Sequence, residues 1–84
     1  MKPYKNLSGN SSVIAYEYDL MSIRVKFNNG WIYEYTVAKL GEVTIREMKQ
    51  LADAGRGLGS YISSNRPRVY KGWSRRFKWQ RNHF

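Results

Sequence analysis

The chain has 84 residues, a formal net charge of +9 and no cysteine. This length allows one domain with a single small core and leaves no room for a cofactor-binding domain or a deep enzyme cleft, and a chain without cysteine forms neither disulfides nor thiolate metal sites. No apolar run approaches the ~20 residues of a membrane span, and the first residues lack the apolar stretch of a signal peptide, so we expect a cytoplasmic protein.

The first half of the chain predicts a β-meander. Residues 1–10 are polar and read as a flexible lead-in. Three runs rich in Val, Ile, Tyr and Phe follow, and such runs are typical of β-strands. The predicted strands cover about residues 13–19, 22–28 and 31–37. The short turns between them predict antiparallel neighbours.

The alternation of side chains decides how the second and third strands pair. A two-residue loop would place Lys26 on the same face as Tyr33. A three-residue loop that ends in a left-handed Gly30 instead pairs Val25 with Tyr33. We choose the three-residue loop because it keeps one face of the meander apolar.

The two faces of the predicted meander differ in chemistry. One face is apolar and aromatic, and carries Ile14, Tyr16, Tyr18, Ile23, Val25, Phe27, Trp31, Tyr33, Tyr35 and Val37. The other face places Glu17, Arg24 and Glu34 side by side across three strands. Such a charge row stabilises a solvated sheet face by up to ~1 kcal/mol per pair, so we interpret it as structural.

The tyrosines on the apolar face allow two interpretations. Tyr33 and Tyr35 are spaced like the aromatic residues that stack on bases in open-sheet RNA-recognition modules. A covering helix, however, needs an apolar face to pack on. We therefore interpret Tyr33 and Tyr35, and likewise Tyr16 and Tyr18, as core residues.

A helix N-terminus is predicted after the meander. Thr44 and Glu47 have the spacing of a capping box, and Val43 and Met48 lie where a hydrophobic staple would form. Apolar residues then recur at helical spacing, which is typical of an amphipathic helix.

The predicted helix covers about residues 44–54 and ends at Gly55. A second short helix is predicted at about 59–65, and it stops before Pro67 because the residue preceding proline avoids helical geometry. The predicted fold is therefore a small α+β domain. In it, a three-stranded antiparallel meander packs against one helix and a second short helix, and a basic aromatic extension follows.

Several short motifs follow one another along the chain. They are Ser11-Ser12-Val13-Ile14, Tyr18-Asp19, Ile23-x-Val25-x-Phe27, Asn29-Gly30, Tyr33-x-Tyr35 and Gly59-Ser60-Tyr61. In this order they resemble the KTSC domain, a short module found at the C-terminus of some lysyl-tRNA synthetases and alone in small bacterial and phage proteins. The resemblance covers about residues 11–66, so that residues 67–84 extend past the usual end of the domain. It implies no established activity, and RNA binding is suspected for the family.

The last nineteen residues, 66–84, hold seven Lys or Arg, five aromatic residues and no acid. Cations interleaved with aromatic rings suit a ligand that has both a charged backbone and flat faces, and single-stranded nucleic acid is the commonest such ligand. The predicted phosphate contacts are Arg66, Arg68, Lys71, Arg75, Arg76, Lys78 and Arg81. Trp79 and Trp73 are predicted to stack on bases.

Two arrangements of this tail remain open. As a helix, it would carry Tyr70, Trp73 and Phe77 as one apolar stripe with the cations beside it. Alternatively, these three aromatic residues dock on the sheet and complete the core. In either arrangement the cations remain free to bind, and Trp79 lies off the stripe.

The glycine-rich segment 55–59 resembles a phosphate-binding loop only superficially. It lacks the following Lys-Ser or Lys-Thr, and a helix rather than a strand precedes it. We interpret it as a connection between helices. Its backbone N–H groups beside Arg56 offer one additional phosphate contact.

The sequence predicts a small non-enzymatic module that binds RNA or single-stranded DNA. It predicts no catalytic residue, metal or cofactor, because the single His83 has no carboxylate or second ligand nearby. The alternative is a protein-interaction module, such as a phage-type inhibitor or adaptor, that binds an acidic partner surface. A basic amphipathic helix on an anionic membrane ranks last, and the oligomeric state is not predicted.

Overall fold

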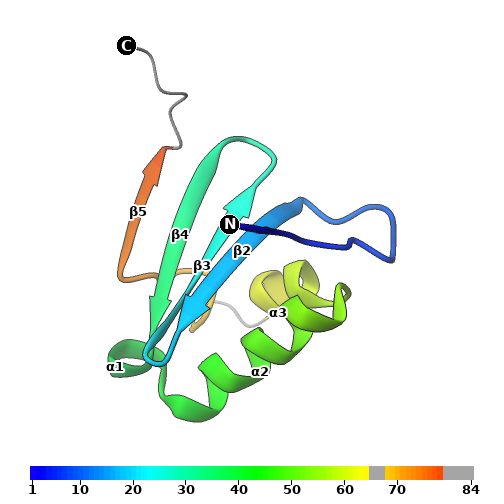
Figure 1. Ribbon diagram of the computed structural model, residues 1–84. Helices are drawn as coiled ribbons and strands as arrows, with labels where there is room; N and C mark the ends of the chain where they lie inside the picture. Colours follow the sequence, from blue (N-terminus) through cyan, green and yellow to red (C-terminus); the bar gives the residue numbers. More distant parts are fainter. Residues whose placement is uncertain (65–67, 79–84) are drawn as a thin grey trace.

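The computed structural model describes residues 1–64 and 68–78 (Figure 1). They form one antiparallel sheet of five strands in the order β1-β2-β3-β4-β5. The strands are β1 (Lys2–Pro3), β2 (Val13–Asp19), β3 (Ser22–Phe27), β4 (Trp31–Thr36) and β5 (Arg75–Lys78). The helices of the described residues are α1 (Val37–Leu40), α2 (Glu42–Ala54) and α3 (Leu58–Ser64). Helices α2 and α3 lie on the same side of the sheet, and the α+β class is confirmed.

The central meander matches its prediction. Strands β2, β3 and β4 differ from the predicted ranges by at most one residue, and Val25 pairs with Tyr33 as expected. Gly30 has φ 91°, and its N–H donates to the carbonyl of Phe27 at 2.9 Å, which closes the three-residue loop. The sheet has two more strands than the predicted meander, one at each edge.

A β-bulge near the start of β2 overturns part of the predicted face pattern. The pairing with β3 shifts between Val13 and Ala15, so that alternation restarts there. Val13 is consequently buried, whereas Ile14 is 44% exposed, and its predicted place on the core face is wrong. Tyr18 is also wrong as a core residue, since it is 42% exposed at the far end of the strand.

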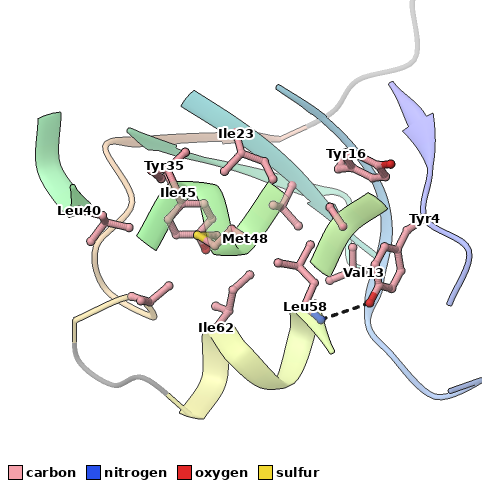
Figure 2. Close-up of a cluster of buried hydrophobic side chains, with 13 residues drawn as sticks. Tyr4, Val13, Tyr16, Ile23, Tyr35, Leu40, Ile45, Met48, Leu58 and Ile62 are labelled. Atoms are coloured by element: carbon pink, nitrogen blue, oxygen red, sulfur yellow. Dashed lines mark hydrogen bonds between the residues drawn. The ribbon is translucent and has the colours of Figure 1, made fainter. Parts of the chain in front are cut away.

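The N-terminal residues belong to the fold and do not form a flexible lead-in over 1–10. Lys2–Pro3 pairs with β2 as an edge strand, and Tyr4 is buried in the core. The hydroxyl of Tyr4 accepts a hydrogen bond from the backbone N–H of Leu58 at 3.2 Å, which ties the N-terminus to the first turn of α3 (Figure 2). This N–H is one of the helix-terminal donors that has no partner within the helix.

Tyr4→Phe is therefore expected to lower the free energy of unfolding by about 1–3 kcal/mol, because it leaves the buried N–H of Leu58 without an acceptor. Tyr18→Phe is the matched control. Its hydroxyl donates to Asp53 from a side chain that is 42% exposed, where water replaces the lost bond, so its loss should be smaller. Urea unfolding of both variants measures the difference, and equal losses would contradict a structural role for the Tyr4 hydroxyl.

Helix α2 begins at Glu42, two residues before the predicted start, so the capping box and staple are wrong. Thr44 is buried inside the first turns, and no side chain caps this helix. Val43 is 57% exposed and does not staple to Met48. The predicted end is confirmed, because Gly55 follows the helix with φ 78°.

The early start of α2 follows from an unpredicted helical turn, α1, directly after β4. Thr36 caps this turn, and its Oγ1 accepts the N–H of Lys39 at 3.3 Å. Gly41, with φ 89°, then redirects the chain into α2. The conformation of Gly41 therefore sets where α2 begins.

The core lies between the sheet and helices α2 and α3 (Figure 2). As predicted, it combines alternating residues of the strands with the apolar stripes of both helices. The buried residues include Ile23, Val25, Tyr35, Ile45, Met48, Ala52, Leu58 and Ile62. Helix α3 confirms the second predicted helix within the described residues.

Residues 68–78 complete this core and sheet. They form turns followed by strand β5 along the free edge of β4, and not the helix that an aromatic stripe would need. Val69 is fully buried, and Trp73 packs against the core, whereas Tyr70 and Phe77 are 45% and 39% exposed. Completion of the core is thus correct for Trp73 and wrong for Tyr70 and Phe77, although Phe77 lies in the sheet as a residue of β5. The described part of the predicted 67–84 extension shares one core with the predicted 11–66 domain.

One carboxylate links the sheet to α2. Asp53 accepts hydrogen bonds from the hydroxyl of Tyr16 at 2.8 Å and from that of Tyr18 at 2.7 Å. These bonds, first that of Tyr18 and then that of Tyr16, hold the pKa of Asp53 below its usual value. Burial, together with the bond to Asp53, raises the pKa of Tyr16 to about 12.

This link predicts a pH-dependent contribution to stability. A carboxyl with a lowered folded pKa stabilises the fold above its unfolded pKa of about 4, and that stabilisation is lost as the pH falls through the folded value. We expect Asp53→Asn to be less stable than the natural chain at pH 7, with the difference shrinking in acid. Urea unfolding at pH 7 and pH 3 measures it, and a difference that stays constant between the two would argue against the link.

Candidate functional site

A cavity of about 730 Å³ lies between α3 and the end of the sheet that carries the turn between β3 and β4. Its walls come from the loop of residues 8–12, the turn between β3 and β4, strand β4, helix α3 and the turn 70–73. The volume lies within the range of about 300–1,000 Å³ that encloses small ligands. Segments distant in the sequence therefore meet around one hollow.

Aromatic rings form one wall of the cavity, with Tyr33 at their centre. The Tyr33 ring lies 5.4 Å from that of Phe27 and 5.8 Å from that of Trp73, both in edge-to-face geometry, and 6.5 Å from the nearly parallel ring of Tyr35. Alternation along β4 puts Tyr33 and Tyr35 on the helix-covered face. Tyr35 is buried, whereas Tyr33 and Trp73 are only partly buried.

The turn before β5 delivers Trp73 to this wall. Gly72 is buried where the chain passes Leu40, and a Cβ atom there would overlap the Leu40 side chain and the carbonyl oxygen of Arg68. The N–H of Gly72 donates to the carbonyl of Val69 at 2.9 Å. A larger residue at position 72 would therefore displace the turn that leads into Trp73.

Arg76 is held over the aromatic wall. It pairs with Tyr33 across β4 and β5, and its guanidinium carbon lies 4.9 Å from the ring centre of Trp73, 5.1 Å from that of Trp31 and 5.9 Å from that of Tyr33. Its Nη1 also donates to the Tyr33 hydroxyl at 3.3 Å. Each exposed cation–π contact contributes about 0.5–1 kcal/mol. The guanidinium of Arg76 is therefore held on the face of the sheet that carries these rings, without any ligand present.

Two lysines extend this positive charge. Lys78 lies opposite Trp31, with its Nζ 5.4 Å from the ring centre. Lys71 lines the cavity, is exposed, and its ammonium group forms no hydrogen bond or ion pair within the described residues. We name Trp31, Tyr33, Lys71, Trp73, Arg76 and Lys78 together the aromatic–cationic surface.

The acidic side chains of the chain all lie away from the cavity lining. Glu34 accepts from Arg75 Nε at 2.7 Å and forms an ion pair with Arg24 Nε at 3.1 Å, on the opposite face of the sheet. Glu47 accepts from the hydroxyl of Tyr61, and Asp53 from two tyrosines. Because Lys71 and Arg76 line the cavity and no acid does, the cavity carries positive charge, which favours anionic ligands.

Strand alternation separates the predicted contact residues. The structure brings Lys71, Trp73, Arg76 and Lys78 to one surface. Arg75 lies on the opposite face of the same strand, paired with Glu34 in the predicted charge row.

The other predicted contacts do not join this surface. Arg68 donates to the carbonyl of Leu40 at 3.1 Å, which satisfies the end of α1. Arg56 is exposed in the connection between α2 and α3, outside the cavity lining. Arg66, Trp79 and Arg81 lie outside the described residues.

A polar rim was not anticipated from the sequence. Eight Ser and Asn side chains line the cavity: Ser8, Asn10, Ser11, Ser12, Asn28, Asn29, Ser60 and Ser63. They come from three separate segments, and the sequence predicts no contact role for any of them. No local pattern links them, because only the tertiary fold gathers them.

The described residues contain no group of three or more His, Cys, Asp or Glu placed to hold a metal ion. Within the same part of the chain, no helix combines the length and apolar character needed to cross a membrane. Comparisons of the chain with protein-family models, curated proteins and solved structures find no match.

Proposed function

We propose that this protein is a non-enzymatic module that binds RNA or single-stranded DNA through the aromatic–cationic surface. The observation that carries the proposal is the set of three rings around Arg76, flanked by Lys71 and Lys78, with no acid in the adjoining cavity. Exposed bases stack on such rings at about 1–3 kcal/mol per base, and phosphates pair with the cations. A duplex offers the phosphates without free base faces.

The proposal assigns different roles to the cations of the C-terminal segment. Lys71, Arg76 and Lys78 share the surface, and we assign phosphate contacts to them. Arg75 and Arg68 already bind Glu34 and a backbone carbonyl, so we assign them structural roles. Arg66, Arg81 and Trp79 remain predicted contacts from the sequence.

Fluorescence anisotropy with labelled 20-nucleotide strands tests the proposal. With three phosphates neutralised, the logarithm of the association constant should fall against the logarithm of salt concentration with a slope of about −2. The affinity should then drop by about 15- to 20-fold between 50 and 200 mM salt. A duplex of the same length should bind more weakly, and no binding of any single strand at 50 mM salt would refute the proposal.

A protein-interaction module is the second candidate. Trp, Tyr and Arg are enriched at interface hot spots, and Trp31, Tyr33, Trp73 and Arg76 form such a cluster. A phage-type inhibitor or adaptor would use it to grip an acidic surface. In a pulldown from nuclease-treated lysate, a stoichiometric protein partner would favour this candidate, and loss of all partners would favour nucleic acid.

We further propose that the chain is a KTSC-like module that acts in the cytoplasm without a cofactor. Its motifs over residues 11–66 support the family assignment. The membrane-bound helix loses support, because Arg75–Lys78 is a strand. The membrane alternative would regain support if the intact protein sedimented together with anionic liposomes.

A further inference from the structure

The cavity beside the aromatic–cationic surface is larger than base stacking requires. A flat platform of rings is enough for bases to stack, whereas a hollow of about 730 Å³ encloses a small ligand. The hollow adjoins the surface directly, because Tyr33, Lys71, Trp73 and Arg76 belong to both. A ligand bound on the surface can therefore reach into the cavity.

The chemistry of the walls matches the parts of one nucleotide. Rings of Phe27, Tyr33 and Trp73 offer an apolar wall for the face of a base. The polar rim comes from other elements, the N-terminal loop, the turn after β3 and α3, and it faces the same hollow. A base likewise has flat π faces and an edge of hydrogen-bond donors and acceptors.

Part of the rim has hydrogen-bonding capacity to spare. The side chains of Ser12, Asn28 and Ser60 form no hydrogen bond within the described residues. An Asn amide both donates and accepts, and a serine hydroxyl does the same, so together they can match the polar edge of a base. A site that hydrogen-bonds its ligand rejects analogues that leave those groups unpaired.

We infer that the cavity binds a single unstacked nucleotide, with its base against Tyr33 and Trp73, its edge toward the Ser and Asn rim, and its phosphate toward Lys71 and Arg76. This inference rests on the proposed function and deepens it, because it makes binding selective for the base. The ligand is either one splayed nucleotide of a strand or a free nucleotide. The two share the same chemistry, and the test separates them.

Filling the cavity tests the inference. Ser60 lines the cavity from an exposed position of α3, so Ser60→Trp should occupy the hollow without removing charge. Ser64→Trp is the matched control on the same helix, exposed and outside the cavity lining. Calorimetric titrations with AMP, CMP, GMP and UMP, and anisotropy with the four homopolymeric 20-mers, are run on both variants and on the natural chain.

We expect the natural chain and Ser64→Trp to prefer one base by at least about fivefold in both assays. Ser60→Trp should lose at least about tenfold in affinity for the preferred mononucleotide, and its preference among the 20-mers should disappear. Asn28→Ala, in an exposed turn, provides a variant without added bulk and should reduce the same preference. Circular dichroism confirms that each variant is folded.

The outcomes separate the two claims. Binding of 20-mers without base preference and without any mononucleotide binding would overturn the cavity inference and leave the proposed function intact. Unchanged preference in Ser60→Trp and Asn28→Ala would overturn it as well. If a mononucleotide binds but no 20-mer does, the proposed function fails, and the cavity is a site for a free nucleotide.

Discussion

Arg76→Ala is expected to weaken single-stranded oligonucleotide binding by about tenfold or more, which corresponds to at least ~1.4 kcal/mol. The guanidinium contributes both a phosphate-binding charge and the contacts that hold three rings in place. Its loss therefore removes one ion pair with the ligand and loosens the stacking wall. The salt dependence of binding should also become shallower, by about 0.7 in the logarithmic slope.

Arg75→Ala is the matched control for this variant. The two arginines are neighbours on β5, carry the same charge and project to opposite faces of the sheet. Glu34 keeps its ion pair with Arg24 when Arg75 is removed, so its buried carboxylate is not left without a cation and the variant should stay folded. Affinity should change by less than about twofold. Equal losses in both variants would mean that net charge, and not the aromatic–cationic surface, binds the ligand.

A chain that ends at Ser64 is expected not to fold. The deletion removes Val69, which is fully buried, the packing of Trp73 on Tyr33, and the whole of β5. Burial of one valine contributes about 1.5–3 kcal/mol, and each lost backbone hydrogen bond about 0.5–1.5 kcal/mol. A domain of this size has a total stability of roughly 4–12 kcal/mol, so these losses approach the whole.

A thermal melt followed by circular dichroism tests this prediction, because it shows whether each chain unfolds in a cooperative transition. A chain that ends at Lys78 keeps every contact described above and should melt cooperatively, whereas the chain that ends at Ser64 should show no cooperative transition. A cooperative melt of the shorter chain would show that residues 1–64 fold without the C-terminal segment and that this segment is a separable extension.

Local patterns predicted the parts of the fold that depend on neighbouring residues. The alternation in β3 and β4, with the Gly30 loop, fixed the register of the meander, and Gly55 marked the end of α2. The bulge at Val13 could not be predicted, because an inserted residue reverses alternation without a sequence signal of its own. Strands β1 and β5 were missed for another reason, since each is short and is defined by the edge that it joins.

The site was predictable in composition and unpredictable in geometry. The density of cations and aromatic residues in the tail predicted Lys71, Trp73, Arg76 and Lys78 as contact residues, and these four lie on the aromatic–cationic surface. The sequence alone could not distinguish the role of Arg75 from that of Arg76. The register of β5 on β4 decides which of the two adjacent arginines lies opposite Glu34 and which lies opposite Tyr33. Tyr33 was assigned to the core, yet it is only partly buried and carries the contacts of the aromatic wall.

The most direct test of the central claim is a ¹H–¹⁵N NMR titration of the intact protein with a single-stranded 20-mer at 50 mM salt. We expect the largest shift changes at the amides of Lys71, Trp73, Arg76 and Lys78 and at the indole N–H of Trp73. The opposite face of the sheet, around Arg24, should change little. Largest changes around Arg24, or no changes at an excess of the strand, would contradict the assignment of the aromatic–cationic surface as the binding site.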